Sequence, residues 1–427
     1  MTTFSLLIGK TTAFIIKNLL NRNASTWPGH MALESNSRFI KNILKKNPDL
    51  KLVLIAGTNG KTTTTKALDH ILISNNISVI RNDSGANLLN GLASLLIKHS
   101  NMKGKINKKA LLFEVDENSL PLILKESNPS AILLLNLFRD QLDRYGEINV
   151  TADKWREALT KVSKQTIIIA NADDPQIVNI TKDLYLTTYF SINDNLKTEK
   201  TLSHAVDSTT CPECFADLTY SKIAYSHIGN FKCPKCNFTN PRSYKYDIKS
   251  NLKGSFNIYN LAAAILTAEK VFKLPNEKSL DTLKDFKPAF GRQEELTYKG
   301  KKIKILLSKN PTGFNESLKV VIQDKCSNIL ILLNDRIPDG RDISWIWDVD
   351  FEMLSEKNQN ITVSGDRTYD MANRLHYADI KSNPVENLDL ALNKALSKTP
   401  KDETLIILPT YSAMLEIRKL LTGKSIL

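Results

Sequence analysis

The sequence predicts an α/β protein with two sheet-containing domains, because two series of short apolar runs alternate with helical patterns. The first series begins at Lys51 and the second begins after Gly291. Continuous apolar runs separated by helices are typical of parallel sheets that helices cover on both faces. The chain has 427 residues, 42% of them apolar and 24% charged, which is ordinary for a globular protein of two or three domains. No apolar stretch reaches the roughly 20 residues that span a bilayer.

Three parts are expected along the chain. Residues 1–48 form a helical segment whose first helix is amphipathic, with anchoring at a membrane surface as an alternative. Residues 49–295 form a central domain with a parallel sheet, whose expected strands are residues 51–56, 77–81, 109–115, 130–137 and 165–171. Residues 296–427 form a smaller Rossmann-like domain, whose expected strands are residues 301–309, 328–335, 360–366 and 403–409. Helical patterns fill the intervals, at Lys61, after Gly85, near Leu120, at residues 257–272, at Glu316, near Met371, at Val385 and at Tyr411.

The net charge of +13 favours an anionic partner, which on charge alone is a nucleic acid, a phosphorylated substrate or a membrane surface. Lys10 and Lys17 interrupt the apolar N-terminus, and no small-residue cleavage site follows, so a secretory signal is not expected. We therefore expect the cytoplasm as the compartment, with a peripheral position at the inner face of the membrane as an alternative.

A phosphate-binding loop is predicted between the first strand and the helix that follows it. The run GTNGKTT, residues 57–63, places backbone N–H groups, a helix N-terminus and Lys61 around an anion, and the Thr62 hydroxyl can bind Mg²⁺. The general pattern has a glycine where this chain has Ile55, so the match is to a shorter variant, and a ligand-free turn is the alternative. The candidate nucleotide-binding residues are Thr58, Asn59, Gly60, Lys61, Thr62 and Thr63.

An acid that holds the Mg²⁺ or its water is expected at the carboxyl edge of the same sheet. Glu114 is the candidate because it ends a buried strand, whereas Asp116 and Glu117 are expected to cap the next helix. Residues 136–141 follow another strand and are equally compatible with loop caps and with ligands.

Four of the 5 cysteines form two C-x-x-C pairs within an insert at about residues 205–245. Four thiolates at this spacing can bind zinc tetrahedrally with no open position, as in a structural ribbon. Disulfides or a redox pair are the alternative. The candidate zinc ligands are Cys211, Cys214, Cys233 and Cys236. Cys326 is expected to be a plain core cysteine, and His227 a surface imidazole rather than a further ligand.

Zinc ribbons often serve nucleic acids, but the segment between the two pairs has no Arg/Lys stripe interleaved with aromatic residues. No nucleic-acid partner is therefore expected. In the C-terminal part, residues 344–352 alternate acids with apolar residues and hold two of the 4 tryptophans. This pattern indicates an extended segment with Asp348, Asp350 and Glu352 on one face, either a solvated edge strand or a functional acidic face.

The loop at 57–63, the acid at Glu114, the run NADD at 171–174, the helix at 254–264 and the run FGR at 290–292 resemble the Mur ligase superfamily. The resemblance covers nearly the whole chain. It implies a ligase that activates a carboxylate with ATP as an acyl phosphate, which an amine then attacks. It also implies that Asn257 or Asn260 contacts the nucleotide and that Arg292 binds its phosphates.

Departures from the superfamily pattern narrow the resemblance. About 50 residues precede the loop, too few for a UDP-binding first domain, Asp140-Gln141 stands where many members have Asp-His, and no counterpart of their carbamylated lysine is found. The ribbon and the passages 309–311 and 339–352 resemble the MurT family, synthetase subunits of lipid II isoglutaminyl synthase. This resemblance implies ATP, Mg²⁺ and Zn²⁺ as cofactors. It implies a GatD-like glutaminase subunit as partner and lipid II, at the cytoplasmic face of the membrane, as substrate.

The implied reaction is amidation of the α-carboxylate of D-isoglutamate in the lipid II stem peptide to D-isoglutamine, with ammonia from the glutaminase. Asp348 matches the functional acid of the family and is expected to orient ammonia or to accept its proton, with Asp350 as the fallback. Two alternatives remain at this point. One is a ligase resembling folylpolyglutamate synthase, and the other is a zinc-ribbon ATPase that binds nucleic acid.

Overall fold

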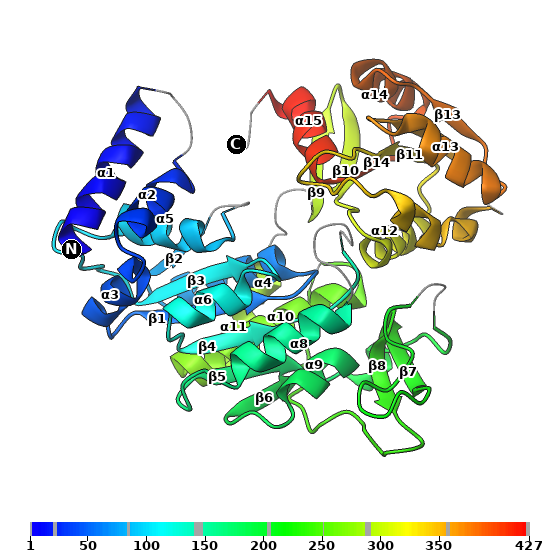
Figure 1. The fold of residues 1–427 in the computed structure, drawn as a ribbon. Helices are drawn as coiled ribbons and strands as arrows, with labels where there is room; N and C mark the ends of the chain where they lie inside the picture. Colours follow the sequence, from blue (N-terminus) through cyan, green and yellow to red (C-terminus); the bar gives the residue numbers. More distant parts are fainter. Residues whose placement is uncertain are drawn as a thin grey trace.

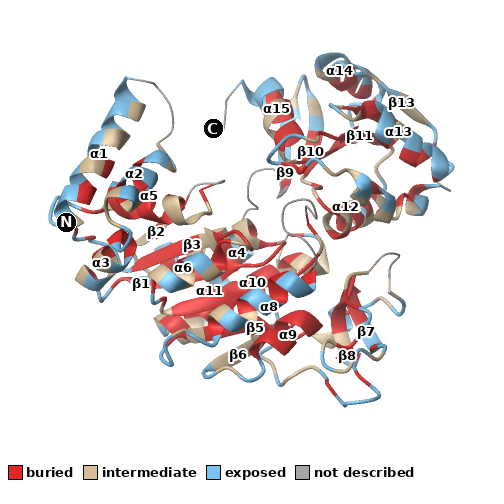
Figure 2. Cartoon of the chain, viewed as in Figure 1, coloured by how far each residue is buried: buried red, intermediate tan, exposed pale blue. Residues whose placement is uncertain are grey.

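The computed structural model describes residues 2–19, 24–82, 86–140, 148–202, 206–250, 252–286, 292–355 and 359–423, with the backbone alone at residue 292. Two parts built on six-stranded sheets face each other, and a group of helices and a small hairpin complete the chain (Figure 1). Buried residues concentrate in the two sheets and in the helix faces packed on them (Figure 2).

Three helices precede the first strand, in agreement with the helical pattern expected there: α1 (Thr2–Asn18), α2 (Trp27–Ser35) and α3 (Phe39–Lys46). Leu6, Ala32 and Phe39 are buried in the same core as the first sheet. Within α1, a Cβ at Gly9 would lie 2.5 Å from the Ile97 side chain, so glycine allows α1 to pack closely on its neighbours.

The first sheet is parallel throughout, in the order β2-β3-β1-β4-β5-β6. Its strands are β1 (Lys51–Ala56), β2 (Val79–Arg81), β3 (Ala110–Val115), β4 (Ala131–Leu134), β5 (Ile167–Asn171) and β6 (Thr187–Phe190). Alternate residues of β1 point to opposite faces, so Leu54 joins one core and Ile55 joins the other. Burial on both faces explains why these strands read as continuous apolar runs.

Helices cover both faces of this sheet. Along the chain they are α4 (Lys61–Ser74), α5 (Leu89–His99), α6 (Leu120–Glu126), α8 (Ile148–Leu159), α9 (Pro175–Thr181), α10 (Ser255–Phe272) and α11 (Asn276–Thr282), with a 3-10 turn η2 (Leu283–Asp285). Residues of α4 and α10 share one core, and residues of α5, α6, α8 and α9 share the other. The predicted parallel sheet with helices on both faces is therefore confirmed.

A short 3-10 turn η1 (Asp194–Leu196) precedes the predicted insert. The insert itself contains an antiparallel hairpin of β7 (Thr219–Tyr225) and β8 (Ile228–Lys232). Leu218, Phe231 and Phe238 form a small core with two of the cysteines and with Val178 of α9. The tip of the hairpin packs into the core of the first sheet through Tyr225 and Ile228. The insert therefore packs on the first domain at its tip and at α9.

The second sheet has the order β13-β12-β11-β14-β10-β9. Its strands are β9 (Arg292–Tyr298), β10 (Lys301–Leu306), β11 (Asn328–Leu332), β12 (Asn360–Ser364), β13 (Ser382–Pro384) and β14 (Thr404–Pro409), and its helices are α12 (Pro311–Gln323), α13 (Thr368–Tyr377), α14 (Leu388–Lys398) and α15 (Tyr411–Thr422). Only β9 is antiparallel to its neighbour, so the sheet is mixed. The expected boundary between residues 295 and 296 falls inside β9. The domain boundaries therefore stay predictions.

The segment around Asp348 is not the expected extended strand. It forms two 3-10 turns, η3 (Ser344–Asp348) and η4 (Phe351–Leu354). Ile346 and Val349 are buried, as are Phe351 and Leu354, and this spacing of three residues is the period of a 3-10 turn. The three acids therefore do not share one face, because the apolar residues between them follow a period of three rather than two.

Candidate functional site

The phosphate loop, residues 57–63, joins β1 to α4 at the carboxyl edge of the first sheet. Gly57 and Gly60 have φ angles of +145° and +90°, which side-chain-bearing residues rarely adopt. A Cβ at Gly60 would lie 2.1 Å from Asn260 Oδ1, so glycine lets the loop pass against α10. The first backbone N–H groups of α4 then begin directly at the loop, which is the arrangement that binds phosphate.

The segment after β4 holds the loop in place. Asn59 N donates to Asn136 Oδ1 at 2.9 Å, and Asn136 Nδ2 donates back to Asn59 O at 3.1 Å. Phe138 N donates to Thr58 Oγ1 at 3.0 Å. Two residues of the predicted phosphate loop, Thr58 and Asn59, are therefore held by the segment at 136–141. The sequence was equally compatible with loop caps and with ligands in this segment. Residue 141 lies outside the described residues.

Lys61 lies over the loop and beside a buried acid. Its Nζ donates to Gly57 O at 2.5 Å and lies 3.3 Å from Glu117 Oε1. Glu117 is buried and its backbone O accepts from Trp155 Nε1 at 2.8 Å. The interpretation of Glu117 as a helix cap was wrong, because a buried carboxylate needs a cation nearby and Lys61 supplies it. The Asp116 carboxylate accepts from Asn118 N, two residues before α6 begins.

Two predicted magnesium ligands lie side by side. Thr62 Oγ1 donates to Glu114 Oε2 at 2.7 Å. Two oxygens bound to one Mg²⁺ in neighbouring octahedral positions are about 2.9 Å apart. The hydroxyl and the carboxylate therefore fit one magnesium ion, next to the phosphate loop.

The four predicted zinc ligands also meet. The Sγ atoms of Cys211, Cys214, Cys233 and Cys236 all lie within 4.8 Å of one another, and two pairs are 3.6 and 3.4 Å apart. Tetrahedral zinc with sulfur at 2.3 Å needs about 3.8 Å between sulfurs. The backbone N–H of Cys236 donates to Cys233 Sγ and lowers the pKa of that thiol to about 6. Burial raises the pKa of the Cys211 thiol, and the pKa of Cys236 is raised to about 12, so the fit to zinc rests on the geometry of the four sulfurs. The cluster thus fits a structural zinc ion.

His227 is fully buried at the tip of the β7–β8 hairpin, so the prediction of a surface imidazole was wrong. Its ring lies 4.7 Å from that of Phe138, and its Nε2 lies 3.6 Å from Asp174 Oδ2. Asp174 Oδ2 accepts from Leu137 N at 2.9 Å. The sequence could not reveal this burial, because it depends on the docking of the hairpin tip against residues 137–138. Cys326 is only partly buried and packs against a core of the second sheet.

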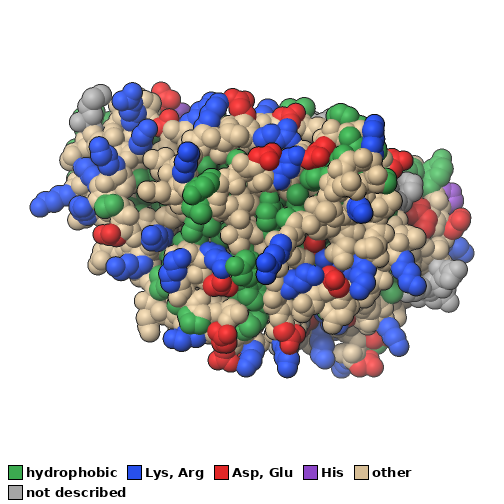
Figure 3. Space-filling view, turned by 90° about the horizontal axis from the view of Figure 1, so that it is seen from below, with side chains coloured by type: hydrophobic (Ala, Val, Ile, Leu, Met, Phe, Trp, Pro, Cys, Tyr) green, Lys and Arg blue, Asp and Glu red, His purple; other side chains and the backbone are tan. Residues whose placement is uncertain are grey.

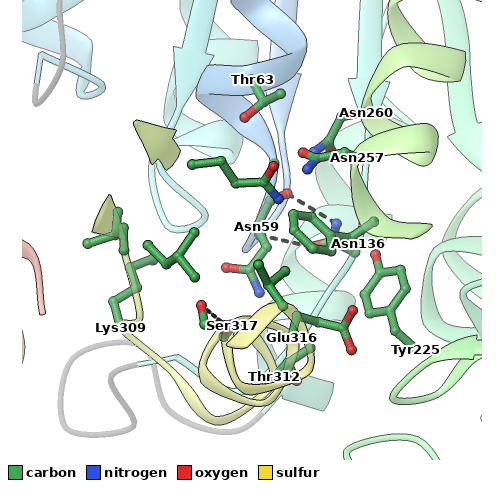
Figure 4. Close-up of a pocket in the computed structure, with 17 residues that line it drawn as sticks. Asn59, Thr63, Asn136, Tyr225, Asn257, Asn260, Lys309, Thr312, Glu316 and Ser317 are labelled. Atoms are coloured by element: carbon green, nitrogen blue, oxygen red, sulfur yellow. Dashed lines mark hydrogen bonds between the residues drawn. The ribbon is translucent and has the colours of Figure 1, made fainter. Parts of the chain in front are cut away.

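A cleft of about 820 Å³, open solvent included, separates the phosphate loop from α12 (Figure 4). Asn257 and Asn260 of α10 line it on one side, and Thr312 and Glu316 of α12 line it on the other (Figure 4). Burial raises the pKa of Glu316. Tyr225, from the hairpin, completes the wall. The helix α10 and the phosphate loop therefore face one cleft. This arrangement is required if Asn257 or Asn260 is to contact a nucleotide bound at the loop.

Arg292 begins β9, and its side chain lies outside the described residues. Its neighbour Gln293 lines the cleft. Lys253 N donates to Gln293 Oε1 at 3.1 Å, and Gln293 Nε2 donates to Lys253 O at 2.7 Å. The start of β9 is therefore fastened to the segment that precedes α10, next to the cleft.

Asp348, in the C-terminal domain, contacts the first domain. Its Oδ2 lies 3.3 Å from a terminal guanidinium nitrogen of Arg139, and Arg139 Nε donates to Asp207 Oδ1 at 2.5 Å. Asp350 accepts instead from Asn315 Nδ2 at 3.0 Å, within its own domain, and Glu352 accepts from Arg374. The three acids thus have three separate partners.

Two further contacts, neither of which the sequence revealed, join the domains beside the loop. Lys309 is ion-paired with Asp140, and Asn310 Nδ2 donates to Asn59 Oδ1 at 3.1 Å. Asn310 also caps α12, because its Oδ1 accepts from Gly313 N at 2.8 Å. The C-terminal domain therefore touches the phosphate loop directly.

Two family models match the chain. The model described as the Mur ligase middle domain matches residues 55–268, and the model described as the MurT ligase C-terminal matches residues 307–414. The first match contains the phosphate loop, both magnesium candidates and the ribbon, and the second contains Asp348.

Curated relatives match over nearly the whole length. The Staphylococcus aureus protein named lipid II isoglutaminyl synthase (glutamine-hydrolyzing) subunit MurT is 32% identical over 416 residues, 92% of this chain and 92% of that protein. The Streptococcus pneumoniae protein of the same name is 30% identical, and the match covers 100% of this chain and 98% of that protein.

Solved structures share the fold. A pseudomurein peptide ligase type C from Methanothermus fervidus has a TM-score of 0.67 at 22% identity, covering 90% of this chain and 81% of that one. A Mycobacterium tuberculosis folylpolyglutamate synthase has a TM-score of 0.60 at 13% identity, covering 94% and 99%. These likenesses concern the fold alone. With a middle-domain match over half of its length and relatives at 30–32% identity over nearly all of it, the chain belongs to the MurT family of Mur ligases.

Proposed function

We propose that this protein is the synthetase subunit of a lipid II isoglutaminyl synthase, an ATP-dependent carbon–nitrogen ligase of peptidoglycan synthesis. It amidates the α-carboxylate of D-isoglutamate in the lipid II stem peptide to D-isoglutamine. One observation carries the proposal: a phosphate loop with its magnesium ligands faces a cleft whose other wall comes from the MurT-type C-terminal domain. The MurT relatives supply the substrate class.

ATP binds with its phosphates at residues 58–63 and its remainder in the cleft toward Asn257 and Asn260. The N–H groups at the start of α4 and the Lys61 ammonium stabilise the charge that develops on the transferred phosphoryl group. Thr62 and Glu114 would hold Mg²⁺, which neutralises phosphate charge when it is bound. Glu117 keeps Lys61 over the loop in a fixed orientation. Arg292, at the start of β9, is proposed as a further phosphate ligand.

The reaction has two steps. An oxygen of the substrate carboxylate attacks the γ-phosphorus of ATP, a C–O–P bond forms, and ADP leaves. Ammonia then attacks the carbonyl carbon, the C–O bond to phosphate breaks, and the carboxamide and phosphate are released. Asp348 orients ammonia or accepts its proton, a role for a carboxylate within hydrogen-bond reach, and Arg139 holds Asp348 toward the first domain.

The remaining assignments follow from the chemistry of the residues. Cys211, Cys214, Cys233 and Cys236 would hold a structural zinc ion that stabilises the insert. Ammonia comes from a GatD-like glutaminase subunit, because the relatives are named as glutamine-hydrolysing. None of the described helices is both long and apolar enough to cross a bilayer. We propose a cytoplasmic protein that meets lipid II at the membrane surface.

The test is to co-express the chain with a GatD-like subunit, supply lipid II, ATP and glutamine, and measure the stem peptide by mass spectrometry. The expected result is the mass decrease of a carboxylate converted to a carboxamide, dependent on ATP and on glutamine. Elongation of folate with glutamate, or ATP turnover stimulated by DNA or RNA, would replace the proposal with one of the two alternatives.

A further inference from the structure

The outer face of α1 is apolar and exposed, which is unusual for a helix at the surface of a globular domain. Phe4, Phe14 and Leu19 have exposed fractions of 63%, 65% and 73%, and Leu7 and Ile15 are exposed beside them. The spacing of 3.6 residues per turn puts Phe4, Leu7, Phe14 and Ile15 on one side of the helix, where Thr11 and Asn18 are exposed between them. Leu19 follows directly after the last helical residue. Ser5, Leu6 and Gly9 occupy the opposite side and are buried. We call Phe4, Leu7, Phe14, Ile15 and Leu19 the α1 patch.

The helix is anchored firmly from behind, so the α1 patch is not a consequence of a loose terminus. Lys10 Nζ of α1 donates to Ile97 O of α5 at 3.1 Å, and Leu6 of α1 is buried in the core of the first sheet. The neighbouring α2 is tied to α5 in turn, because Gly29 N donates to Ser94 Oγ at 2.8 Å. Trp27 and Met31 of α2 add further exposed apolar surface next to α1. A group of exposed apolar side chains on two neighbouring helices is typical of an interaction site.

The charges near the α1 patch indicate what kind of partner binds there. The first Asp or Glu of the chain is Glu34, whereas Lys10 and Lys17 of α1 precede it. The whole chain has 45 Asp and Glu among 427 residues, so a stretch of this length without an acid is distinctive. On the face shown in Figure 3, by contrast, Lys and Arg are interspersed with Asp and Glu. Exposed apolar side chains with cations and no acids are complementary to an anionic lipid surface.

The dimensions fit binding parallel to the membrane rather than insertion across it. The 17 residues of α1 give a helix of about 25 Å, and no described helix meets the requirements for a membrane span. An exposed tryptophan such as Trp27 is typical of the headgroup region. In addition, α1 and the C-terminal sheet domain project from the same side of the first sheet (Figure 1).

We propose that α1, with Trp27 and Met31 of α2, docks the protein on the anionic surface of a lipid bilayer. The apolar side chains enter the boundary between headgroups and acyl chains, and Lys17 contacts the headgroups. The inference goes beyond the proposed function, because it concerns a surface outside the cleft and holds for any substrate.

The experiment measures co-sedimentation of the full chain with vesicles of phosphatidylcholine and phosphatidylglycerol in equal parts. The variant Phe4→Ser/Phe14→Ser removes two aromatic rings from the α1 patch. The matched control Ile337→Ser/Leu390→Ser removes two side chains that are 74% and 61% exposed on the C-terminal domain. The expected result is a partition coefficient at least about tenfold lower for the α1 variant, with the control equal to the wild type.

A charge variant and a solution assay complete the test. Lys17→Glu should weaken binding to the anionic vesicles and leave binding to pure phosphatidylcholine vesicles unchanged. Failure of the wild type to bind, or equal binding by Phe4→Ser/Phe14→Ser, would overturn the proposal. A dimer in solution that this variant dissociates would overturn it too, because a second copy would then cover the α1 patch. Amidation of lipid II in detergent tests the proposed function without a bilayer, so the two proposals can fail separately.

Discussion

The phosphate loop and the acidic segment around Asp348 are the two halves of the candidate site, and they are positioned in different ways. The loop follows β1 directly, turns on two glycines with positive φ and runs into α4. Asp348 lies in a 3-10 turn of the other domain, and its orientation depends on Arg139, which Asp207 of the insert holds. The turn of the phosphate loop is therefore encoded by neighbouring residues, whereas the position of Asp348 depends on contacts among three segments that are far apart in the chain.

The largest effect is expected at Lys61, in the locally encoded half. Lys61→Met removes the charge that offsets the transferred phosphoryl group, and we expect about a thousandfold loss of lipid II-dependent ADP formation. Lys278→Met, at an exposed position of α11, is the control and should keep full activity. An unimpaired Lys61→Met enzyme would show that the loop is not the phosphate site.

The acid of the other half should give the second largest effect. Asp348→Asn keeps the size of the side chain but cannot accept a proton, so amidation should fall about a hundredfold while ADP binding, measured by calorimetry, is unchanged. Asp350→Asn is the matched comparison, because Asp350 bonds to Asn315 within its own domain. A larger loss at Asp350 than at Asp348 would make Asp350 the functional acid.

Removal of zinc tests whether the insert contributes to the geometry of the site between the two halves. Cys214→Ser should abolish zinc binding, measured by elemental analysis, and lower the free energy of unfolding by about 2 kcal/mol or more. Activity should fall about tenfold, because Tyr225 of the attached hairpin lines the cleft. Cys326→Ser, outside the cluster, should retain one zinc per chain. Full zinc content in Cys214→Ser would exclude the four-thiolate site.

The smallest effect is expected at Asp207, which acts through Arg139. Asp207→Asn should lower amidation about threefold to tenfold, and Arg139→Gln should give a similar loss. In the double variant the two losses should not add, with a coupling energy of about 1 kcal/mol. Strictly additive losses would mean that Asp207 does not aim Arg139 at Asp348.

The parts predicted best are those that a short stretch of sequence specifies. Continuous apolar runs gave strands β1, β3, β4, β5 and the central strands of the second sheet, since burial on both faces requires apolar side chains at every position. The strands β6, β7, β8, β9 and β13 were not predicted. β13 has only three residues, and both β6 and β13 are largely half-buried edge strands, so the apolar signal is weak.

The interpretation of the C-terminal acids as one face was wrong for a related reason. An alternation of acids and apolar residues fits a strand locally. In the structure, Phe351 instead packs against Phe314 of α12 at 5.0 Å between ring centroids. Packing against α12 therefore decided the local conformation, and a sequence window does not contain that partner.

By itself, the sequence predicted the α/β fold class, a phosphate loop with Thr62 and Glu114 beside it, and a four-cysteine cluster. The structure confirms the fold class and brings these residues together. These features rest on backbone conformation and on burial patterns within a few residues, or on ligand spacing. The tertiary structure alone decided that Glu117 faces Lys61, that His227 is buried and that Arg139 joins Asp207 to Asp348. Such contacts arise when segments far apart in the chain pack together, because buried charges and polar groups then take whichever partners the packing brings close.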